Sequence, residues 1–179
     1  MIENELKILE VDKSEFIKKI KSMGAETVFE NLKQCRYVYD IDSNDKSKWI
    51  RLRTNGLVST LTIKKILDTS KIDGTEEHEV EVSNFEETNK ILNLMGFKAR
   101  SYQENLRSFY KLDGVEISVD SWPLIPTYAE IEGKNVDDVL KLTEKLNIDK
   151  SKITTKDVTS IYNDFYGIDL LKIENLKLD

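Results

Sequence analysis

Hydrophobic and polar residues alternate along several short stretches of the chain, which is the pattern of β-strands with one apolar and one polar face. The first stretch, residues 2–8, places Glu3, Glu5 and Lys7 together on its polar face. Further stretches of this kind lie at residues 49–53, 57–65, 77–82, 115–120 and 128–132. The pattern therefore predicts a sheet whose polar face is rich in charged side chains.

Three segments between the strands repeat their apolar residues at helical spacing instead. They begin at Asp12, Asn84 and Asn135, and each of these residues is followed three positions later by an acidic residue, as in an N-terminal capping box. A fourth helix is expected over residues 155–166, with its apolar residues on one side. Strands and helices together predict a fold of the α+β class.

Two arrangements of the strands fit this pattern. A flat sheet with one solvated face would show it, and so would a closed antiparallel barrel with a polar lumen and helices outside. The apolar faces of the strands need helices to cover them, and the chain supplies these helices. We therefore expect the barrel, and because no linker rich in Gly, Ser or Pro divides the chain, we expect a single domain over residues 1–179.

Part of the chain is repeated. Met23-Gly24, at the end of the first expected helix, returns as Met95-Gly96, and Glu30-Asn31-Leu32 returns as Glu104-Asn105-Leu106. The repeat is either a coincidence or the mark of two related halves that close one sheet.

Composition narrows the possible chemistry. The net charge of −6 and the pI of about 5.1 argue against nucleic acid as a partner. Cys35 and His78 are the only residues of their types, which excludes a disulfide framework, a cysteine zinc site and a histidine-rich metal site. No apolar run has transmembrane length and no signal-peptide core is present, so we expect a cytoplasmic protein without a membrane partner.

Acids and bases alternate with apolar neighbours on the same strands. Arginine, with its two-pronged guanidinium group, suits phosphate oxygens, and Mg²⁺ or Mn²⁺ requires the oxygen ligands that carboxylates supply. A lumen that carries both could bind a polyphosphate together with a divalent ion. The chain has no glycine-rich phosphate loop, so a P-loop nucleotide site is excluded.

The motif E-x-E-x-K at Glu3, Glu5 and Lys7, followed by R-x-R at Arg51 and Arg53, resembles the signature of the CYTH family, the triphosphate tunnel metalloenzymes. This family includes class IV adenylyl cyclases, thiamine triphosphatases and inorganic triphosphatases. The resemblance implies a closed eight-stranded antiparallel β-barrel with helices packed outside, Mg²⁺ or Mn²⁺ as cofactor, and a triphosphate-containing small molecule as ligand.

The resemblance also implies a role for each matching residue. The triphosphate-binding residues would be Lys7, Arg51, Arg53, Lys64 and Arg107. The metal-binding residues would be Glu3, Glu5, Glu79, Glu81, Asp120, Glu130 and Glu132. Lys7 and Lys156 are the candidate catalytic residues, Lys156 because it precedes a segment that resembles the family's closing helix.

The chain departs from the family pattern beside Arg107, where Asn105 and Leu106 replace a second basic residue. Trp49 and Trp122 are interpreted as packing residues, so the sequence shows no clear adenine pocket. Three functions stay open: a metal-dependent triphosphatase, which we favour, a class IV adenylyl cyclase that makes cyclic AMP and pyrophosphate from ATP, and a non-catalytic binder of polyphosphate or nucleotide. Whether the protein forms a homodimer is also open.

Overall fold

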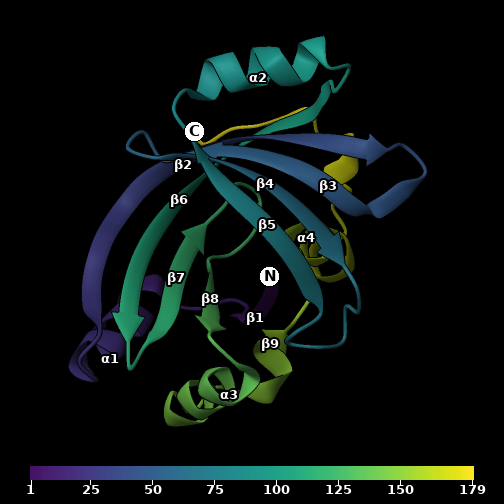
Figure 1. Ribbon diagram of the computed structural model, residues 1–179. Helices are drawn as coiled ribbons and strands as arrows, with labels where there is room; N and C mark the ends of the chain where they lie inside the picture. Colours follow the sequence, from purple (N-terminus) through teal and green to yellow (C-terminus); the bar gives the residue numbers. More distant parts are fainter.

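Eight antiparallel strands close into a barrel in the computed structural model, which describes residues 1–179 (Figure 1). These strands are β1 (Ile2–Ile8), β2 (Glu26–Asp42), β3 (Asp45–Thr54), β4 (Ser59–Ile66), β5 (Thr75–Val82), β6 (Ala99–Leu112), β7 (Val115–Ser121) and β8 (Tyr128–Gly133). Their order around the barrel is β6-β2-β3-β4-β5-β1-β8-β7, and the pairing of β7 with β6 closes it. The predicted fold class is confirmed.

Four helices and several short elements surround the barrel. The helices are α1 (Lys13–Ser22), α2 (Phe85–Leu94), α3 (Val136–Lys145) and α4 (Val158–Tyr166), and the short elements are η1 (Lys150–Lys152), β9 (Ile153–Thr154), η2 (Leu170–Lys172) and β10 (Asn175–Leu176). The side chains of Asp12, Asn84 and Asn135 accept the backbone N–H three residues ahead, at 2.9–3.0 Å. The three predicted capping boxes therefore start α1, α2 and α3. None of these helices has the length and apolar character needed to cross a bilayer.

The apolar faces of the strands point outward, and helices cover much of them, although Ile63 of β4 and Val80 of β5 stay exposed. Phe16 of α1 and Leu142 of α3 belong to one buried cluster with Leu6, Ile117 and Ile131 of the barrel wall. On the opposite side, α2 lies across β2 and β3 at the top of Figure 1. This outward packing leaves the polar strand faces to line the interior.

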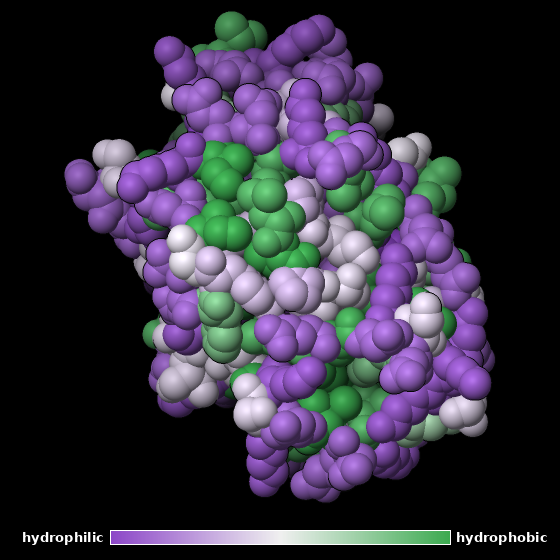
Figure 2. Space-filling model, turned by 180° about the vertical axis from the view of Figure 1, so that it is seen from behind, coloured by the Kyte–Doolittle hydropathy of each residue, from purple (hydrophilic) through white to green (hydrophobic).

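The chain after residue 157 covers one end of the barrel. Ile161 and Tyr162 of α4 are fully buried against Trp122 and Tyr128, and β10 extends the sheet by pairing with β6. Figure 2 shows the molecule from behind, with hydrophobic residues gathered in the centre of this face and hydrophilic residues around them.

The repeated sequence corresponds to a repeated unit of structure. Gly24 and Gly96 both adopt a left-handed backbone, with φ of +97° and +96°, directly after α1 and α2. Each glycine leads into a long strand, β2 or β6, and these two strands pair along most of their length. The repeat thus marks two equivalent helix–strand units that lie side by side in the barrel wall.

Candidate functional site

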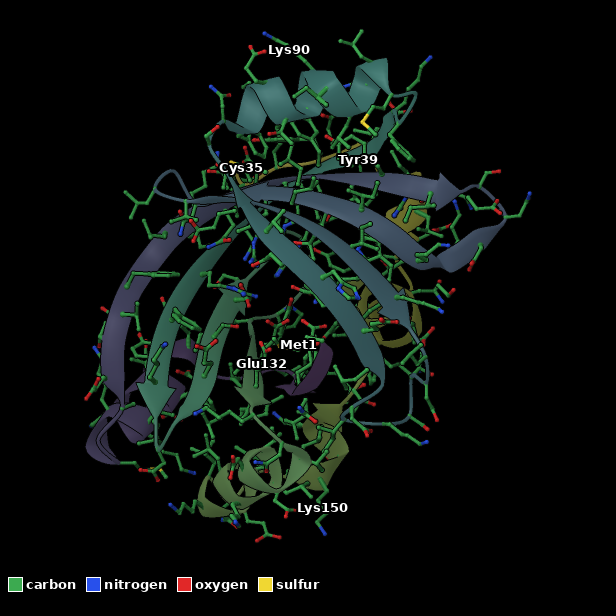
Figure 3. The ribbon with its side chains drawn as sticks, in the orientation of Figure 1. Met1, Cys35, Tyr39, Lys90, Glu132 and Lys150 are labelled. Atoms are coloured by element: carbon green, nitrogen blue, oxygen red, sulfur yellow. The ribbon has the colours of Figure 1, made fainter.

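The polar faces of the strands line a cavity of about 940 Å³ in the barrel interior. Most of the predicted site residues line it; the exceptions are Glu81, Asp120 and Lys156. In Figure 3, Glu132 lies inside the barrel, whereas Lys90 on α2 and Lys150 lie on the outside of the molecule. The cavity is therefore built from the alternating strand faces that the sequence predicts.

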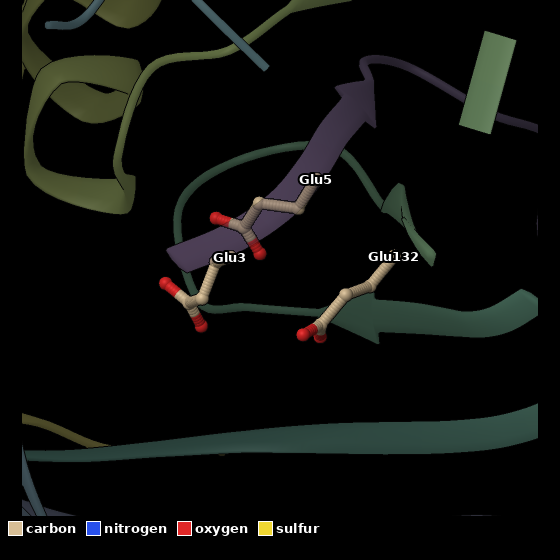
Figure 4. A group of neighbouring side chains, drawn as sticks. All are labelled: Glu3, Glu5 and Glu132. Atoms are coloured by element: carbon tan, nitrogen blue, oxygen red, sulfur yellow. The ribbon is translucent and has the colours of Figure 1, made fainter. Parts of the chain in front are cut away.

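Three carboxylates converge on one side of the cavity. Oxygens of Glu3, Glu5 and Glu132 all lie within 4.8 Å of one another (Figure 4). The first two are two residues apart on β1 and so share a face, while Glu132 of β8 is the register partner of Glu5. Three convergent carboxylates are a suitable ligand set for a hard divalent cation such as Mg²⁺ or Mn²⁺.

The electrostatics of this three-carboxylate cluster also fit a cation. Burial and the charge of Glu5 raise the pKa of Glu3 to about 8 and the pKa of Glu132 to about 7. Lys64 donates to Glu3 at 2.7 Å and Lys7 donates to Glu5 at 2.7 Å, but these two bases do not suppress the mutual repulsion. Burial and this repulsion favour the protonated forms of Glu3 and Glu132, and a divalent ion that displaces the protons would neutralise the three carboxylates.

Other predicted metal ligands are instead paired with arginine. Arg107 contacts both oxygens of Asp120, at 2.9 and 2.7 Å, and also Glu130 at 2.7 Å. Burial acts to raise the pKa of Glu130, but Arg107 and Lys7 outweigh it and the pKa is lowered. Asp120 is fully buried behind the cavity lining. In this structure Asp120 and Glu130 hold Arg107 in place and do not join the three-carboxylate cluster.

Glu79 is likewise engaged by its neighbours. Its carboxylate accepts a hydrogen bond from Thr62 at 2.7 Å and from Arg51 at 3.1 Å, and it lies 3.5 Å from Arg53. The adjacent strands β3, β4 and β5 bring these four side chains together in one row of the barrel. Glu79 therefore balances the R-x-R pair instead of extending the metal cluster.

Two predicted site residues lie apart from the others. Glu81 is exposed near the end of β5, opposite Thr60, and does not line the cavity. The ammonium group of Lys156 lies 2.6 Å from Asp164 and 5.7 Å from the ring centroid of Phe165. The structure thus does not bring Glu81 and Lys156 together with the other predicted site residues, since neither lines the cavity.

Sequence reasoning missed Glu77, although it alternates with Glu79 on β5. Its carboxylate lies 2.6 Å from Lys64 and 3.4 Å from Arg51, inside the cavity lining. Burial acts to raise the pKa of Glu77, but Arg51 and Lys64 outweigh it and lower the pKa to about 2. The same alternation that suggested Glu79 and Glu81 includes Glu77, and only the register between β4 and β5 shows which pair enters the lumen.

Sequence reasoning also missed a group at the α4 end of the cavity. Arg36, Trp122 and Tyr128 are all buried and line it, and Trp49 lines it elsewhere. Trp122 packs in a buried cluster with Tyr162, in agreement with its interpretation as a packing residue, and it lines the cavity as well. The alternation of Arg36 with Tyr37 in β2 was the available signal for an inward arginine.

Comparison with known proteins agrees with this architecture. The CYTH domain profile matches residues 1–163. The chain belongs to the CYTH family. The resemblance found in the E-x-E-x-K and R-x-R motifs is thereby confirmed.

Three similar proteins show how far the likeness extends. A provisionally named adenylate cyclase of Methanocaldococcus jannaschii is 26% identical over 87% of this chain and 95% of its own length. A structure from Pyrococcus horikoshii matches with a TM-score of 0.75 and 23% identity, over 87% of this chain and 96% of that one. An adenylyl cyclase candidate from Hippeastrum, described as having a dominant triphosphatase activity, matches with a TM-score of 0.54 and 16% identity, over 96% and 99% of the two chains.

Proposed function

We propose that this CYTH protein is a divalent-metal-dependent enzyme that acts on a triphosphate, and that it is a phosphohydrolase. The observation that carries the proposal is the arrangement of charge inside one cavity. A three-carboxylate cluster (Glu3, Glu5, Glu132) lies on one side, and arginines and lysines, most of them paired with other carboxylates, line further parts of the wall. A polyphosphate with a bound divalent cation matches both, because the cation complements the carboxylates and the phosphate oxygens complement the arginines and lysines.

The lumen bases are suited to hold phosphate oxygens. Arg51 and Arg53 alternate on β3 and project into the cavity, where Arg53 has only one carboxylate neighbour, at 3.5 Å. Burial acts to lower the pKa of Lys7, but Glu5 and Glu130 outweigh it and raise the pKa. Lys7 therefore keeps its proton near neutral pH, so it serves as a fixed positive charge and not as a general base.

The three-carboxylate cluster would hold Mg²⁺ or Mn²⁺. A bound ion of this kind supplies Lewis-acid polarisation of a phosphoryl oxygen. Lys64 lies between Glu3 and Glu77, at 2.7 and 2.6 Å, and so joins the metal side of the cavity to the base-lined wall. Its position allows it to orient a phosphate beside the cluster.

Hydrolysis is our first choice because the cavity offers charged groups around a phosphate chain, and the ring of Trp122 at the α4 end is already in contact with other side chains. Trp122 is covered by Arg36 and contacts Tyr162 edge-on. The triphosphatase activity described for the Hippeastrum protein supports the same choice. The second candidate is an adenylyl cyclase, favoured by the name of the Methanocaldococcus relative and by a cavity volume with room for a nucleoside.

The test is a product assay. Purified protein is incubated with tripolyphosphate or ATP, with Mg²⁺, Mn²⁺ or a chelator, and phosphate, pyrophosphate and cyclic AMP are quantified. We expect metal-dependent release of phosphate. Cyclic AMP and pyrophosphate in equal amounts would identify the cyclase instead, and binding without turnover would leave only the non-catalytic binder.

A further inference from the structure

Arg36 of β2 lies in an unusual position for a buried cation. It is 6% exposed and no carboxylate oxygen lies within 4.0 Å of it, in contrast to Arg51 and Arg107. One guanidinium nitrogen donates to the side-chain oxygen of Asn105, and the guanidinium carbon lies 4.4 Å from the ring centroid of Trp122. A buried charge without a counterion is costly, which calls for a partner from outside the chain.

Neighbouring arginines add positive charge around Arg36, and Asp120, which accepts a hydrogen bond from Asn105, offsets this charge only in part. Arg53 is its register partner on β3. Burial and the charge of Arg51 lower the pKa of Arg36 to about 10, and the charge of Arg51 followed by burial lowers the pKa of Arg53 well below its ordinary value. This region therefore has the opposite imbalance to the three-carboxylate cluster.

Three polar atoms here have no hydrogen-bond partner. They are Nε of Arg36, the indole Nε1 of Trp122 and the hydroxyl of Tyr128, and all three are buried. Trp122 is 5% exposed and Tyr128 is 1% exposed, and both line the cavity beside Arg36. Each of the three atoms carries a hydrogen that can be donated, so the missing partner is an acceptor.

We propose that Arg36, Tyr128 and Trp122, together with Arg53, form an anion subsite that binds one phosphoryl group of the substrate. This inference rests on the proposed function, and it adds a phosphate-binding residue from β2. Tyr128 and Glu132 are four residues apart on β8, or about 13 Å along the strand. The subsite thus receives the phosphoryl group that lies away from the three-carboxylate cluster, at the end covered by α4.

The experiment compares binding of tripolyphosphate with Mg²⁺ by titration calorimetry among four variants. Arg36→Gln removes the charge, Arg36→Lys keeps it, and Tyr128→Phe removes an unpartnered hydroxyl without breaking any internal hydrogen bond. Lys33→Gln is the matched control, because Lys33 is an exposed base on the same strand, paired with Glu104 and outside the cavity. We expect Kd to rise roughly 10- to 100-fold for Arg36→Gln and about 10-fold for Tyr128→Phe, with partial recovery in Arg36→Lys and no change in the control.

A second readout separates this inference from the proposed function. In a Trp49→Phe background Trp122 is the only tryptophan, and its fluorescence is followed during titration with inorganic phosphate. If the wild type binds tripolyphosphate and both Arg36→Gln and Tyr128→Phe bind it equally tightly, the subsite is refuted and the proposed function stands. If tripolyphosphate does not bind but phosphate changes the emission only when Arg36 is present, the subsite stands and the proposed function fails. If neither anion has an effect, both are refuted.

Discussion

Replacing Glu132 with glutamine should make the metal-free protein more stable and abolish its response to metal. Glu132 shares the three-carboxylate cluster with Glu3 and Glu5, and no base lies within ion-pair distance of its carboxylate. Glutamine has the same shape without the charge. The substitution therefore removes repulsion from Glu5 while leaving the packing of β8 intact.

The size of this gain in stability and its pH dependence follow from the pKa of Glu132. Burial, followed by repulsion from Glu5, raises the pKa of Glu132 from 4.5 to about 7. The folded protein therefore binds the proton more tightly than the unfolded chain, and the stability that this carboxyl contributes below pH 4.5 is lost as the pH rises through about 7. A tenfold change in proton affinity is about 1.4 kcal/mol, so ionised Glu132 costs at most roughly 3 kcal/mol.

The assay is thermal unfolding at pH 5 and pH 8, with a chelator and with Mg²⁺. At pH 8 in chelator, the free energy of unfolding of Glu132→Gln should exceed that of the wild type by about 1–3 kcal/mol, which raises Tm by roughly 3–10 °C. At pH 5 the two proteins should have nearly the same Tm. Mg²⁺ at a hundred times Kd should stabilise the wild type by roughly 2.7 kcal/mol and should not stabilise the variant.

The control is Glu81→Gln. Glu81 is a strand carboxylate like Glu132, but it is exposed near the end of β5 and does not line the cavity. Its substitution should change Tm little at either pH. If Glu132→Gln is no more stable than the wild type at pH 8 in chelator, the prediction is wrong, because the surroundings then do not oppose the ionised carboxylate.

Three further predictions concern the site and the wall that supports it. Glu5→Gln should fold and lose metal-dependent turnover; rates near those of the wild type at saturating Mg²⁺ or Mn²⁺ would exclude Glu5 as a ligand. Arg53→Ala should weaken tripolyphosphate binding by about 1.5–3 kcal/mol in calorimetry, and unchanged affinity would show that Arg53 does not contact phosphate. Ile117→Ala, in the fully buried wall beneath α1 and α3, should cost roughly 2–5 kcal/mol in chemical denaturation without changing the pattern of products, and a loss below 1 kcal/mol would contradict the packing described.

The faces of the strands were predictable because side-chain direction in a strand is a local property. Alternation in residues 2–8 places Glu3, Glu5 and Lys7 inward whatever the rest of the chain does. Capping at Asp12, Asn84 and Asn135 is equally local, since the bond spans three residues. These two signals predicted the polar strand faces and the starts of three helices, and the closed eight-stranded barrel followed from the resemblance to the CYTH family.

The grouping of charges within the lumen was not predictable in the same way. It depends on register between strands that are distant in sequence, such as Glu5 with Glu132 and Arg36 with Arg53. A shift of two residues would keep every side chain on its face and yet change every pair. For this reason Glu132, which joins the cluster, could not be distinguished by sequence alone from Glu130, which pairs with Arg107.

The net charge of −6 does not indicate which ligands the cavity can bind, because acidic and basic groups are concentrated at separate places within it. Ionisation of Glu3 and Glu132 opposes the folded state as the pH rises, and the positive charge around Arg36 and Arg53 opposes it as well. A cation alone relieves the first and an anion alone relieves the second. A divalent ion bound to a polyphosphate relieves both in one event, so the binding of either component should favour the binding of the other by the same factor. The arrangement thus favours the metal complex of the substrate over the free anion, which neither imbalance would do by itself.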